Sequence, residues 1–290
     1  MSKNYRAELV GCFGNPIDEN PTGVVEEAAF FEKGLNYRYL TVLVKAEDLG
    51  KAMDGVRAFH MRGVNLTIPH KVAVLQYLDE LSEAAEIIGA VNTVVNNNGV
   101  LFGENTDGKG YLMSLVDEGV DVAGKHIAVL GAGGAARAIA VECALAGAKK
   151  ITVINGNETR GQELVSLLNR RTNASAVYLP WKGTVDIPQD ADILSNATSV
   201  GLYPNTDQRP DINYDTIRSD MVVTDVIFND PNSLFLGEAK CRGAKTVNGL
   251  GMLARQGALN FKLWTGVDAP QELMMETLKK EFGLYAQAKA

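Results

Sequence analysis

The segment His126-Ile-Ala-Val-Leu-Gly-Ala-Gly-Gly-Ala-Ala-Arg137 is the most informative stretch of the chain. Its first five residues predict a buried strand, and the glycines that follow predict a tight turn into an alanine-rich helix. Gly131 permits the turn, and Gly133 lets the backbone approach a pyrophosphate. A helix that starts near Gly134 would point its free N–H groups and positive dipole end at the phosphates. The segment therefore predicts a dinucleotide-binding turn, with a ligand-free packing turn as the alternative.

Working outward, both halves of the chain alternate short apolar runs with helical patterns, which predicts an α/β fold with a mostly parallel sheet. The strand-like runs of the second half are 126–130, 150–154, 176–179, 193–197, 221–225 and 245–247. The first half has strand-like runs at 8–13, 37–44 and 63–67, helical patterns at 21–33, 46–59 and 70–86, and a hairpin over 90–103 around Asn98-Gly99. Because the alternation restarts near Lys125, a domain boundary is expected around 109–124. Two helices close the chain, at 251–264 and 269–282.

Composition limits the classes of partner. The chain has 290 residues, of which 46% are hydrophobic and 22% charged, with a net charge of −7. The acidic balance argues against nucleic-acid and anionic-membrane partners, but not against a small-molecule substrate, even an anionic one, because a local site can be positive on an acidic protein. No apolar run approaches the length of a membrane span, and we expect a cytoplasmic protein. Three widely spaced cysteines and three histidines without ligand spacing predict neither a disulfide framework nor a metal site.

The residues after the second strand of this half bear on the choice between NAD and NADP. NAD enzymes usually carry an acidic residue there, which binds the ribose 2′-hydroxyl. Here Asn155 is neutral, Glu158 is acidic and Arg160 is basic. Glu158 would repel a 2′-phosphate, whereas Arg160 could hold one. We expect NAD in preference to NADP, with both side chains being merely solvated as the alternative.

Two further polar segments have ordinary explanations when each is taken separately. Lys71 follows a short strand and a proline, and it could be a surface charge. Asp107 stands in the polar turn Asn105-Thr-Asp-Gly108, and it could be a helix cap.

Together with the dinucleotide turn, these segments resemble the shikimate/quinate dehydrogenase family. The resembling segments follow family order across nearly the whole chain: Gly14–Ile17, Asn65–Lys71, Gly89–Thr93, Asn105–Gly108, Gly131–Arg137, Ser195–Gly201 and Asn248–Gly266. The resemblance implies an N-terminal α/β substrate-binding and catalytic domain at 1–110, and a Rossmann NAD(P)-binding domain at 111–247. It implies that the helices of 248–290 pack back on the first domain. The implied reaction is reversible hydride transfer between a nicotinamide and the C3 hydroxyl of shikimate, quinate or a related cyclic polyol acid.

The resemblance also implies roles for individual residues. Lys71 and Asp107 match the catalytic pair. An ordinary lysine is a poor base at neutral pH, and a neighbouring carboxylate favours its charged form, so the two would act as one coupled unit. The implied substrate-binding residues are Asn20, Thr22, Thr67, Asn92 and Gln256. The implied cofactor-binding residues are Gly131, Ala132, Gly133, Gly134, Ala135, Asn155, Glu158, Arg160, Thr198, Phe228, Gly249 and Met252.

Departures from the family pattern concern the substrate. Two serines that hold the substrate carboxylate in the family correspond here to Asn20 and Thr22, which can still donate hydrogen bonds. Pro21 suits a first helical position with Asn20 as N-cap, so we expect an anion-binding helix end here, although Glu19 opposes it. The alternative is that Asn20 only caps the helix and the ligand has no carboxylate. Phe228 replaces a family tyrosine and removes a polar contact near the substrate ring.

Other functions stay open at this point. The same chemistry could act on an amino- or non-carboxylated cyclitol, or the chain could be a non-catalytic sensor of NAD and a metabolite. The retained Lys71 and Asp107 argue against the sensor. The oligomeric state is open, with a homodimer as one candidate.

Overall fold

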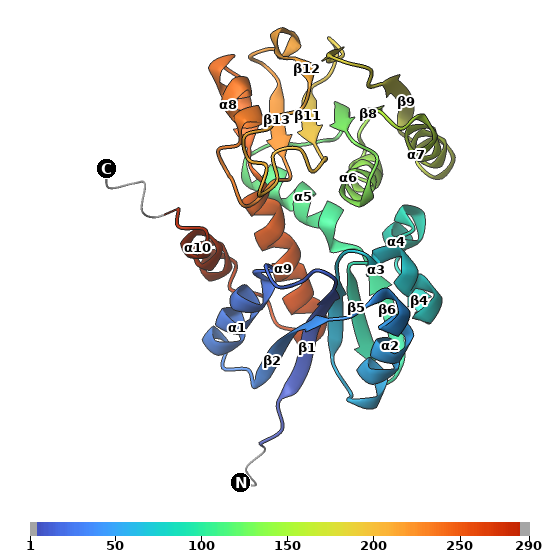
Figure 1. Ribbon diagram of the computed structural model, residues 1–290, viewed down its shortest axis with the longest axis vertical. Coiled ribbons are helices and arrows are strands. Elements are labelled where there is room, and N and C mark those ends of the chain that lie inside the picture. The colour runs from blue at the N-terminus through green and yellow to red at the C-terminus, as the bar shows by residue number, and fades with distance from the viewer. Residues whose placement is uncertain (1–4, 285–290) are drawn as a thin grey trace. The chain divides into compact units, whose positions relative to one another are not determined.

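A computed structural model describes residues 5–284, which form two compact units (Figure 1). The first unit contains the chain up to Thr106 and again from Gln256 onward, and the second contains Asp107–Arg255. The chain thus leaves the first unit once and returns to it. The divisions lie beside residues 106 and 256, near the start of one helix and within another, whereas the sequence favoured 110 and 248. No helix among the described residues is long and apolar enough to cross a membrane.

The first unit is built on a six-stranded sheet in the order β2-β1-β3-β5-β6-β4. Its strands are β1 (Glu8–Gly14), β2 (Tyr37–Leu43), β3 (Gly63–Leu66), β4 (Glu80–Leu81), β5 (Thr93–Asn97) and β6 (Val100–Glu104). Its helices are α1 (Thr22–Glu32), α2 (Leu49–Ala58), α3 (His70–Ala73), α4 (Glu83–Ile88), most of α9 (Gly249–Thr265), and α10 (Gln271–Glu281). The sheet is mixed: β1 pairs in parallel with β2 and β3, and β5 pairs antiparallel with β3 and β6. Asn98 and Gly99 both have positive φ, as the predicted Asn-Gly hairpin turn requires.

Apolar side chains hold both faces of this sheet. On one face Met53 and Val56 of α2 join the buried strand residues. On the other, α1 and α9 meet where the rings of Phe30 and Phe261 stack at 5.3 Å. Trp264 of α9 is fully buried, and its indole Nε1 donates to the Val94 carbonyl at 3.0 Å. The returning helix is therefore part of the core of the first unit.

Two local predictions in this unit are wrong. The pattern 70–86 is not one helix: it contains α3, a 3-10 turn, the edge strand β4 and α4. The break occurs because the Asp79 carboxylate accepts the Leu101 amide at 2.7 Å and residues 80–81 then pair with β6. At α1, Pro21 rather than Asn20 occupies the N-cap position. The pairing of residues 80–81 with the distant strand β6, together with the hydrogen bond of the Asp79 carboxylate, therefore overrides the helical periodicity of 70–86.

The second unit has a fully parallel six-stranded sheet in the order β14-β13-β11-β7-β8-β9. Its strands are β7 (His126–Leu130), β8 (Lys150–Asn155), β9 (Ser175–Pro180), β11 (Ile193–Asn196), β13 (Val222–Asp225) and β14 (Lys245–Val247). A short pair, β10 (Val185–Asp186) with β12 (Ile212–Asn213), lies outside it. The connecting helices are α5 (Thr106–Asp117), α6 (Gly134–Leu145), α7 (Glu158–Arg171) and α8 (Leu234–Cys241). This strand order is that of the doubly wound dinucleotide-binding fold, as predicted.

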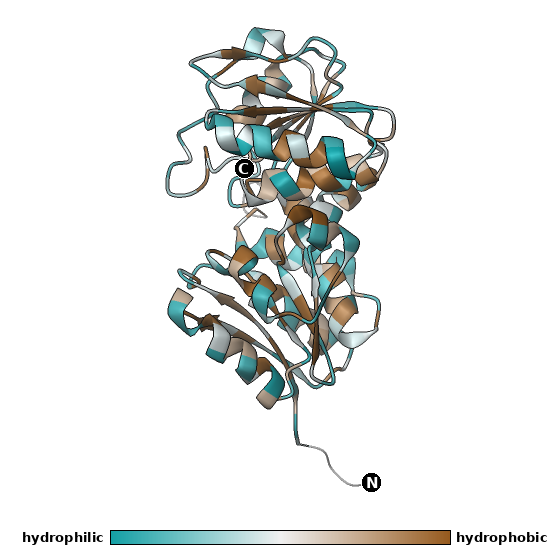
Figure 2. Cartoon of the chain, turned by 90° about the vertical axis from the view of Figure 1, so that its right-hand side faces the viewer, coloured by the Kyte–Doolittle hydropathy of each residue, from teal (hydrophilic) through white to brown (hydrophobic). Residues whose placement is uncertain are grey.

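Alternation along the strands separates the two faces of this sheet. Leu194 and Val223 pack with α8 on one face, whereas the next residue of β13, Thr224, points to the other. There the Tyr111 hydroxyl of α5 lies 3.0 Å from Thr224 Oγ1. The strands are accordingly the brown, apolar interior of each unit, and polar teal concentrates on the outer helix faces (Figure 2).

Candidate functional site

The glycine-rich turn lies at the carboxyl edge of β7, where the connections run to β8 on one side and β11 on the other. Gly131 has φ +108°, a conformation that disfavours any side chain, and its amide donates to the Ile154 carbonyl at 2.8 Å. A Cβ at this position would also lie 3.1 Å from the Ala197 carbonyl oxygen. Ligands of open α/β sheets bind at such a switch point. The turn thus has the backbone geometry that the sequence predicted.

The start of α6 is open to a ligand. The helix begins at Gly134 with Gly133 as its N-cap, and no side chain caps it. A Cβ at either glycine would meet no atom within 4 Å. Unused backbone N–H groups next to open space form a cradle that fits the pyrophosphate of a dinucleotide. The neighbouring Ala132 and Ala135 are small enough to leave this space clear.

The end of β8 differs from the expectation in one respect. The helical pattern of the sequence predicts a helix over 161–171, whereas α7 begins at Glu158, so that Glu158 and Arg160 stand exposed on its first turn. Asn157 caps the helix by accepting the Arg160 amide at 3.0 Å. Asn155 Nδ2 donates to the Asn157 carbonyl at 2.8 Å and braces the loop. A basic group therefore stands at a capped helix N-terminus beside the glycine-rich turn.

The remaining predicted cofactor residues belong to loops after neighbouring strands. Thr198 follows β11, and its hydroxyl donates to Asn196 Oδ1 at 2.7 Å. Gly249 follows β14 and lies against the loop after β13, because a Cβ there would be 2.5 Å from the Ile227 carbonyl oxygen. Phe228 belongs to that same loop, and Met252 lies on the first turn of α9. The structure thus brings the predicted cofactor residues to the carboxyl ends of adjacent parallel strands.

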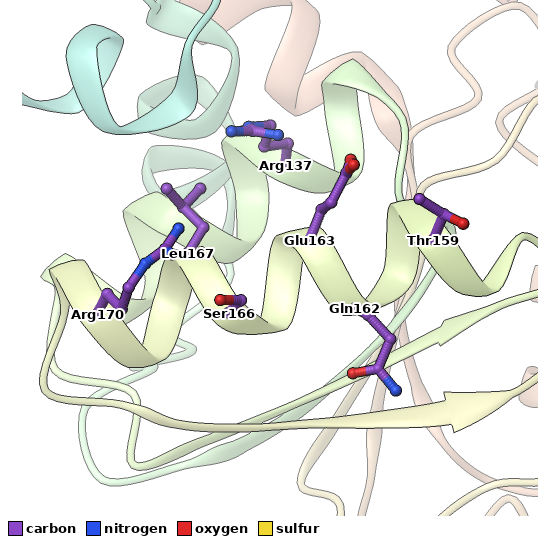
Figure 3. A pocket seen from close by; sticks show the side chains of 7 residues that line it. All are labelled: Arg137, Thr159, Gln162, Glu163, Ser166, Leu167 and Arg170. Atoms are coloured by element: carbon purple, nitrogen blue, oxygen red, sulfur yellow. The ribbon is translucent and has the colours of Figure 1, made fainter.

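A separate pocket of about 530 Å³ lies between α6 and α7 (Figure 3). Arg137 of α6 and Glu163 of α7 point into it. Burial lowers the pKa of the Arg137 guanidinium, and Glu163 partly opposes this. None of the predicted cofactor residues lines this pocket.

In the first unit, Lys71 lies on the short helix α3, one residue after the buried His70. His70 Nε2 lies 2.8 Å from the Val44 carbonyl oxygen, and the Lys71 carbonyl accepts the Val91 amide at 2.8 Å. These bonds hold the backbone of α3 against the strands. Thr67, four residues before Lys71, donates its amide to the Phe13 carbonyl at 3.0 Å. The lysine therefore stands on a fixed backbone at the end of β3.

Asn92 is the centre of a buried polar network. Its Oδ1 accepts the Thr106 amide at 2.8 Å, and its Nδ2 donates to Gln256 Oε1 at 3.1 Å and to Thr106 Oγ1 at 3.0 Å. Asn260, fully buried on α9, accepts through Oδ1 from the hydroxyls of Thr93 and Thr106, at 2.8 and 2.9 Å. The network thus joins the start of β5 to α9 and to Thr106, the residue that precedes Asp107.

Asp107 follows Thr106 directly and lies in the first turn of α5. A carboxylate there is favoured by the positive end of the helix dipole. Its exposed fraction is 9%, so that the carboxyl group is largely shielded from water. The peptide that carries it is fixed by the Thr106–Asn92 bond described above.

Asn20 and Thr22 meet at the start of α1. Asn20 Oδ1 accepts the Thr22 amide at 2.9 Å, and Asn20 Nδ2 lies 3.7 Å from Cys12 Sγ. The Asn20 side chain therefore uses one backbone N–H group at the start of this helix. Burial raises the pKa of the Cys12 thiol to about 12, and the Lys71 ammonium and the Tyr39 hydroxyl nearby oppose this. Lys71 and Asn20 thus share Cys12 as a neighbour.

Several members of this site were not singled out from the sequence. Asn65 Oδ1 accepts from the Tyr39 hydroxyl at 2.9 Å, and its Nδ2 donates to the Asn92 carbonyl at 3.1 Å. Asn65 opens the quoted Asn65–Lys71 segment, so that its position carried a signal. Thr93 and Asn260 likewise lie within quoted segments, whereas Tyr39 gave no signal, because a polar residue in a strand reveals its partner only after folding.

Comparison with known proteins identifies the family. The family model of the shikimate dehydrogenase substrate binding domain matches residues 12–94, and that of the shikimate 5′-dehydrogenase C-terminal domain matches 249–279. A curated relative from Desulforamulus reducens, shikimate dehydrogenase (NADP(+)), is 41% identical over 281 residues, covering 96% of this chain and 97% of its own. The chain belongs to the shikimate dehydrogenase family.

Two solved structures of similar chains give the same result. A ligand-free 5-ketofructose reductase of Gluconobacter sp. strain CHM43 has a TM-score of 0.91 at 43% identity, covering 96% of this chain and 100% of its own. A shikimate 5-dehydrogenase from Listeria monocytogenes, in complex with shikimate and NAD, has a TM-score of 0.89 at 34% identity, covering 96% and 99%. The predicted family and its fold are confirmed.

Family membership also identifies the protein as an NAD(P)-dependent oxidoreductase of the shikimate/quinate dehydrogenase type. The expected preference for NAD is not supported, because the curated relatives are named for NADP(+).

Proposed function

We propose that the protein transfers hydride reversibly between a nicotinamide dinucleotide and a secondary hydroxyl of a small polyhydroxylated substrate, with Lys71 and Asp107 moving the proton. The observation that carries the proposal is the Asn92 network. Asn92 holds Gln256 and Thr106, the residue before Asp107, and it directly follows Val91, whose amide donates to the Lys71 carbonyl. Shikimate and quinate are the first candidate substrates. Thr67, Asn92 and Gln256 would hold the hydroxyls of the ring.

Proton transfer is the task of the protein's own groups. The nicotinamide, when bound, supplies or accepts the hydride. In the oxidative direction the substrate O–H proton passes to the Lys71–Asp107 pair as the carbonyl forms, and in reduction the pair returns it.

We further propose NADP as the preferred cofactor. The cradle formed by Gly131, Gly133 and Gly134 would hold the pyrophosphate. Arg160 would meet the 2′-phosphate at the N-terminus of α7, where backbone N–H groups and the helix dipole also favour an anion. The names of the curated relatives support this choice. Glu158 on the same turn opposes it and would weaken the preference.

A second candidate activity is the reduction of an uncharged polyhydroxy ketone, such as 5-ketofructose. The reductase that bears this name in its title is similar to this chain along 96% of its length. The specific observation in favour is the bond from the Thr22 amide to Asn20 Oδ1, which takes up one backbone donor at the start of α1.

A steady-state matrix tests these proposals. Purified protein is combined with NADP(H) and NAD(H), and with shikimate, quinate, 5-ketofructose and a decarboxylated cyclitol, while nicotinamide absorbance is followed. Lys71→Ala should reduce turnover by orders of magnitude but leave dinucleotide binding intact, since the cofactor residues lie in the other unit. Equal loss of binding and turnover would refute the role of Lys71. Absence of turnover with every pair would refute the proposed activity.

A further inference from the structure

Backbone groups fix the direction of the hydrogen bonds in the Asn92 network. A backbone N–H group only donates, and a backbone carbonyl only accepts. The Thr106 amide donates to the Asn92 side chain at 2.8 Å, so the atom that it meets is the oxygen Oδ1. The other end of this side-chain amide, Nδ2, is therefore the atom that faces Gln256, at 3.1 Å.

The orientation of the Gln256 amide follows from that of Asn92. An amide NH2 group is a donor, so the atom of Gln256 beside Asn92 Nδ2 is the acceptor Oε1. A Gln256 amide turned by half a rotation would oppose two NH2 groups and lose this bond. Nε2 is thus the remaining end of Gln256, and it has no hydrogen-bond partner among residues 5–284. The side chain is only half-buried, so this donor is available to a ligand.

A second buried amide, that of Asn65, fixes the Asn92 peptide. Its Nδ2 donates to the Asn92 carbonyl and to Thr93 Oγ1, both at 3.1 Å, and its Oδ1 accepts from the Tyr39 hydroxyl at 2.9 Å. Asn65 and Asn92 are 7% and 2% exposed, so water does not readily replace these partners. Reversing the network would leave several buried donors and acceptors unpaired at once. Its polarity is therefore a fixed property of the first unit, which a ligand does not alter.

Of the side chains that we assign to the ring hydroxyls, Gln256 is the one that distinguishes a hydroxyl from an amine. The Thr67 hydroxyl both donates and accepts, so it suits either group. Asn92 Nδ2 already donates within the network. Resting on the proposed function, we propose that Gln256, through Nε2, selects substrates with an oxygen acceptor at the position it meets and rejects a protonated amine there.

The selectivity follows from the hydrogen-bonding capacity of the two groups. A hydroxyl or carbonyl oxygen has lone pairs that accept from Nε2, whereas an ammonium group only donates. An ammonium beside Nε2 would lose water partners without gaining a bond, and the hydrogens of both groups carry positive charge that repels. Polyhydroxylated substrates are thus favoured over the amino cyclitols that the sequence left open.

Calorimetric titration tests this selectivity. The ligands are the best substrate of the steady-state matrix and its analogues with one hydroxyl replaced by an amine; for shikimate these are the 4-amino-4-deoxy and 5-amino-5-deoxy compounds. Each is titrated with the dinucleotide that cannot react with it, NADPH for an alcohol and NADP for a ketone. At about pH 6, where the amines are protonated, at least one analogue should bind about 10- to 100-fold more weakly than the parent. That difference should shrink as the pH rises above the pKa of the amine, because a neutral amine accepts a hydrogen bond, whereas an effect of shape alone does not depend on pH.

Gln256→Glu inverts the polarity at this position without changing the size of the side chain. One carboxylate oxygen still accepts from Asn92 Nδ2, and the other replaces the donor Nε2 by an acceptor. The analogue that the wild-type protein rejects should now bind more tightly than the parent. Gln271→Glu, which adds the same charge at the exposed first residue of α10, is the control and should leave the ratio unchanged.

The outcomes separate this inference from the proposed function. Equal binding of the parent and all its analogues at about pH 6, or a ratio that neither pH nor Gln256→Glu changes, would overturn the inference while leaving the oxidoreductase activity standing. The pH series needs no variant, so it decides the question even if Gln256→Glu does not fold. If no substrate of the matrix reacts or binds although the dinucleotide binds, the proposed function fails, and the inference falls with it.

Discussion

Replacing Thr106 by valine removes one hydroxyl from the centre of the Asn92 network without changing the size of the side chain. Thr106 is 1% exposed, and its Oγ1 bonds with Asn92 Nδ2 and Asn260 Oδ1, at 3.0 and 2.9 Å. In the variant, Asn260 Oδ1 keeps the Thr93 hydroxyl, but the hydrogen bonds of Thr106 Oγ1 with Asn92 Nδ2 and Asn260 Oδ1 are lost. Each buried hydrogen bond contributes about 0.5–1.5 kcal/mol, and the added methyl offsets part of this loss. We expect a loss of about 1–2 kcal/mol in the free energy of unfolding.

The functional effect should exceed the loss of stability. Because Thr106 precedes Asp107, and because Asn92 also holds Gln256, loosening this network would misplace both the residue that we propose for proton transfer and one that we propose for substrate binding. We expect kcat/KM to fall at least about tenfold, which corresponds to about 1.4 kcal/mol of transition-state stabilisation.

The matched control is Thr106→Ser, which keeps the hydroxyl and loses the methyl. Removing one buried methyl costs about 1 kcal/mol, so that the two variants should have similar stability. Urea unfolding measures that quantity, and nicotinamide absorbance measures turnover with the best substrate of the matrix. If serine and valine reduce activity equally, packing and not the hydroxyl network positions Asp107, and the reasoning fails.

Two further predictions concern the second unit. Burial raises the pKa of Asp225 from 3.8 to about 6, so the folded protein holds this proton more tightly than the unfolded chain, and the stability that Asp225 contributes at low pH is lost as pH rises through that window. The free energy of unfolding of Asp225→Asn should therefore gain about 2 kcal/mol relative to wild type between pH 4 and pH 7, and a pH-independent difference in urea titrations would contradict this. Gly108→Ala should destabilise the protein by about 2–3 kcal/mol, because the new Cβ would lie 2.4 Å from the Ala138 carbonyl oxygen of α6. Gly237→Ala, on the open side of α8, should instead be neutral or stabilising by up to about 1 kcal/mol in thermal unfolding, and equal losses in both variants would rule out the clash.

Local sequence patterns were sufficient to predict the strands and the glycine-rich turn of the second unit. The run from His126 to Arg137 has strand periodicity, a glycine at a positive-φ turn and a strong helix former afterwards, and all three requirements are local. The repeated alternation then leaves a parallel sheet as the packing that buries each apolar strand on both faces. For this reason the strand positions and the glycine-rich turn could be predicted to within a few residues.

Predictions failed where a distant segment competes with a local preference. The helical pattern of 70–86 yields to β4 because residues 80–81 gain a place at the edge of the sheet. Sequence periodicity contains no information about such a distant partner. Helix α7, in contrast, starts three residues early for a local reason, because Asn157 caps it.

The sequence by itself determined the family, the α/β fold, the glycine-rich turn and the candidate pair Lys71 and Asp107, since these depend on residue types at fixed spacing. Only the tertiary structure decided which hydrogen bonds the proposed substrate-binding residues make. It joined Asn92 to Gln256 across 164 residues, gave the Thr22 amide to Asn20, and left the carboxyl group of Glu26 buried without a hydrogen-bond partner in the described part of the chain. The physical reason is that hydrogen-bond satisfaction and desolvation depend on which groups meet in space, and the helix that returns at the end of the chain creates those meetings.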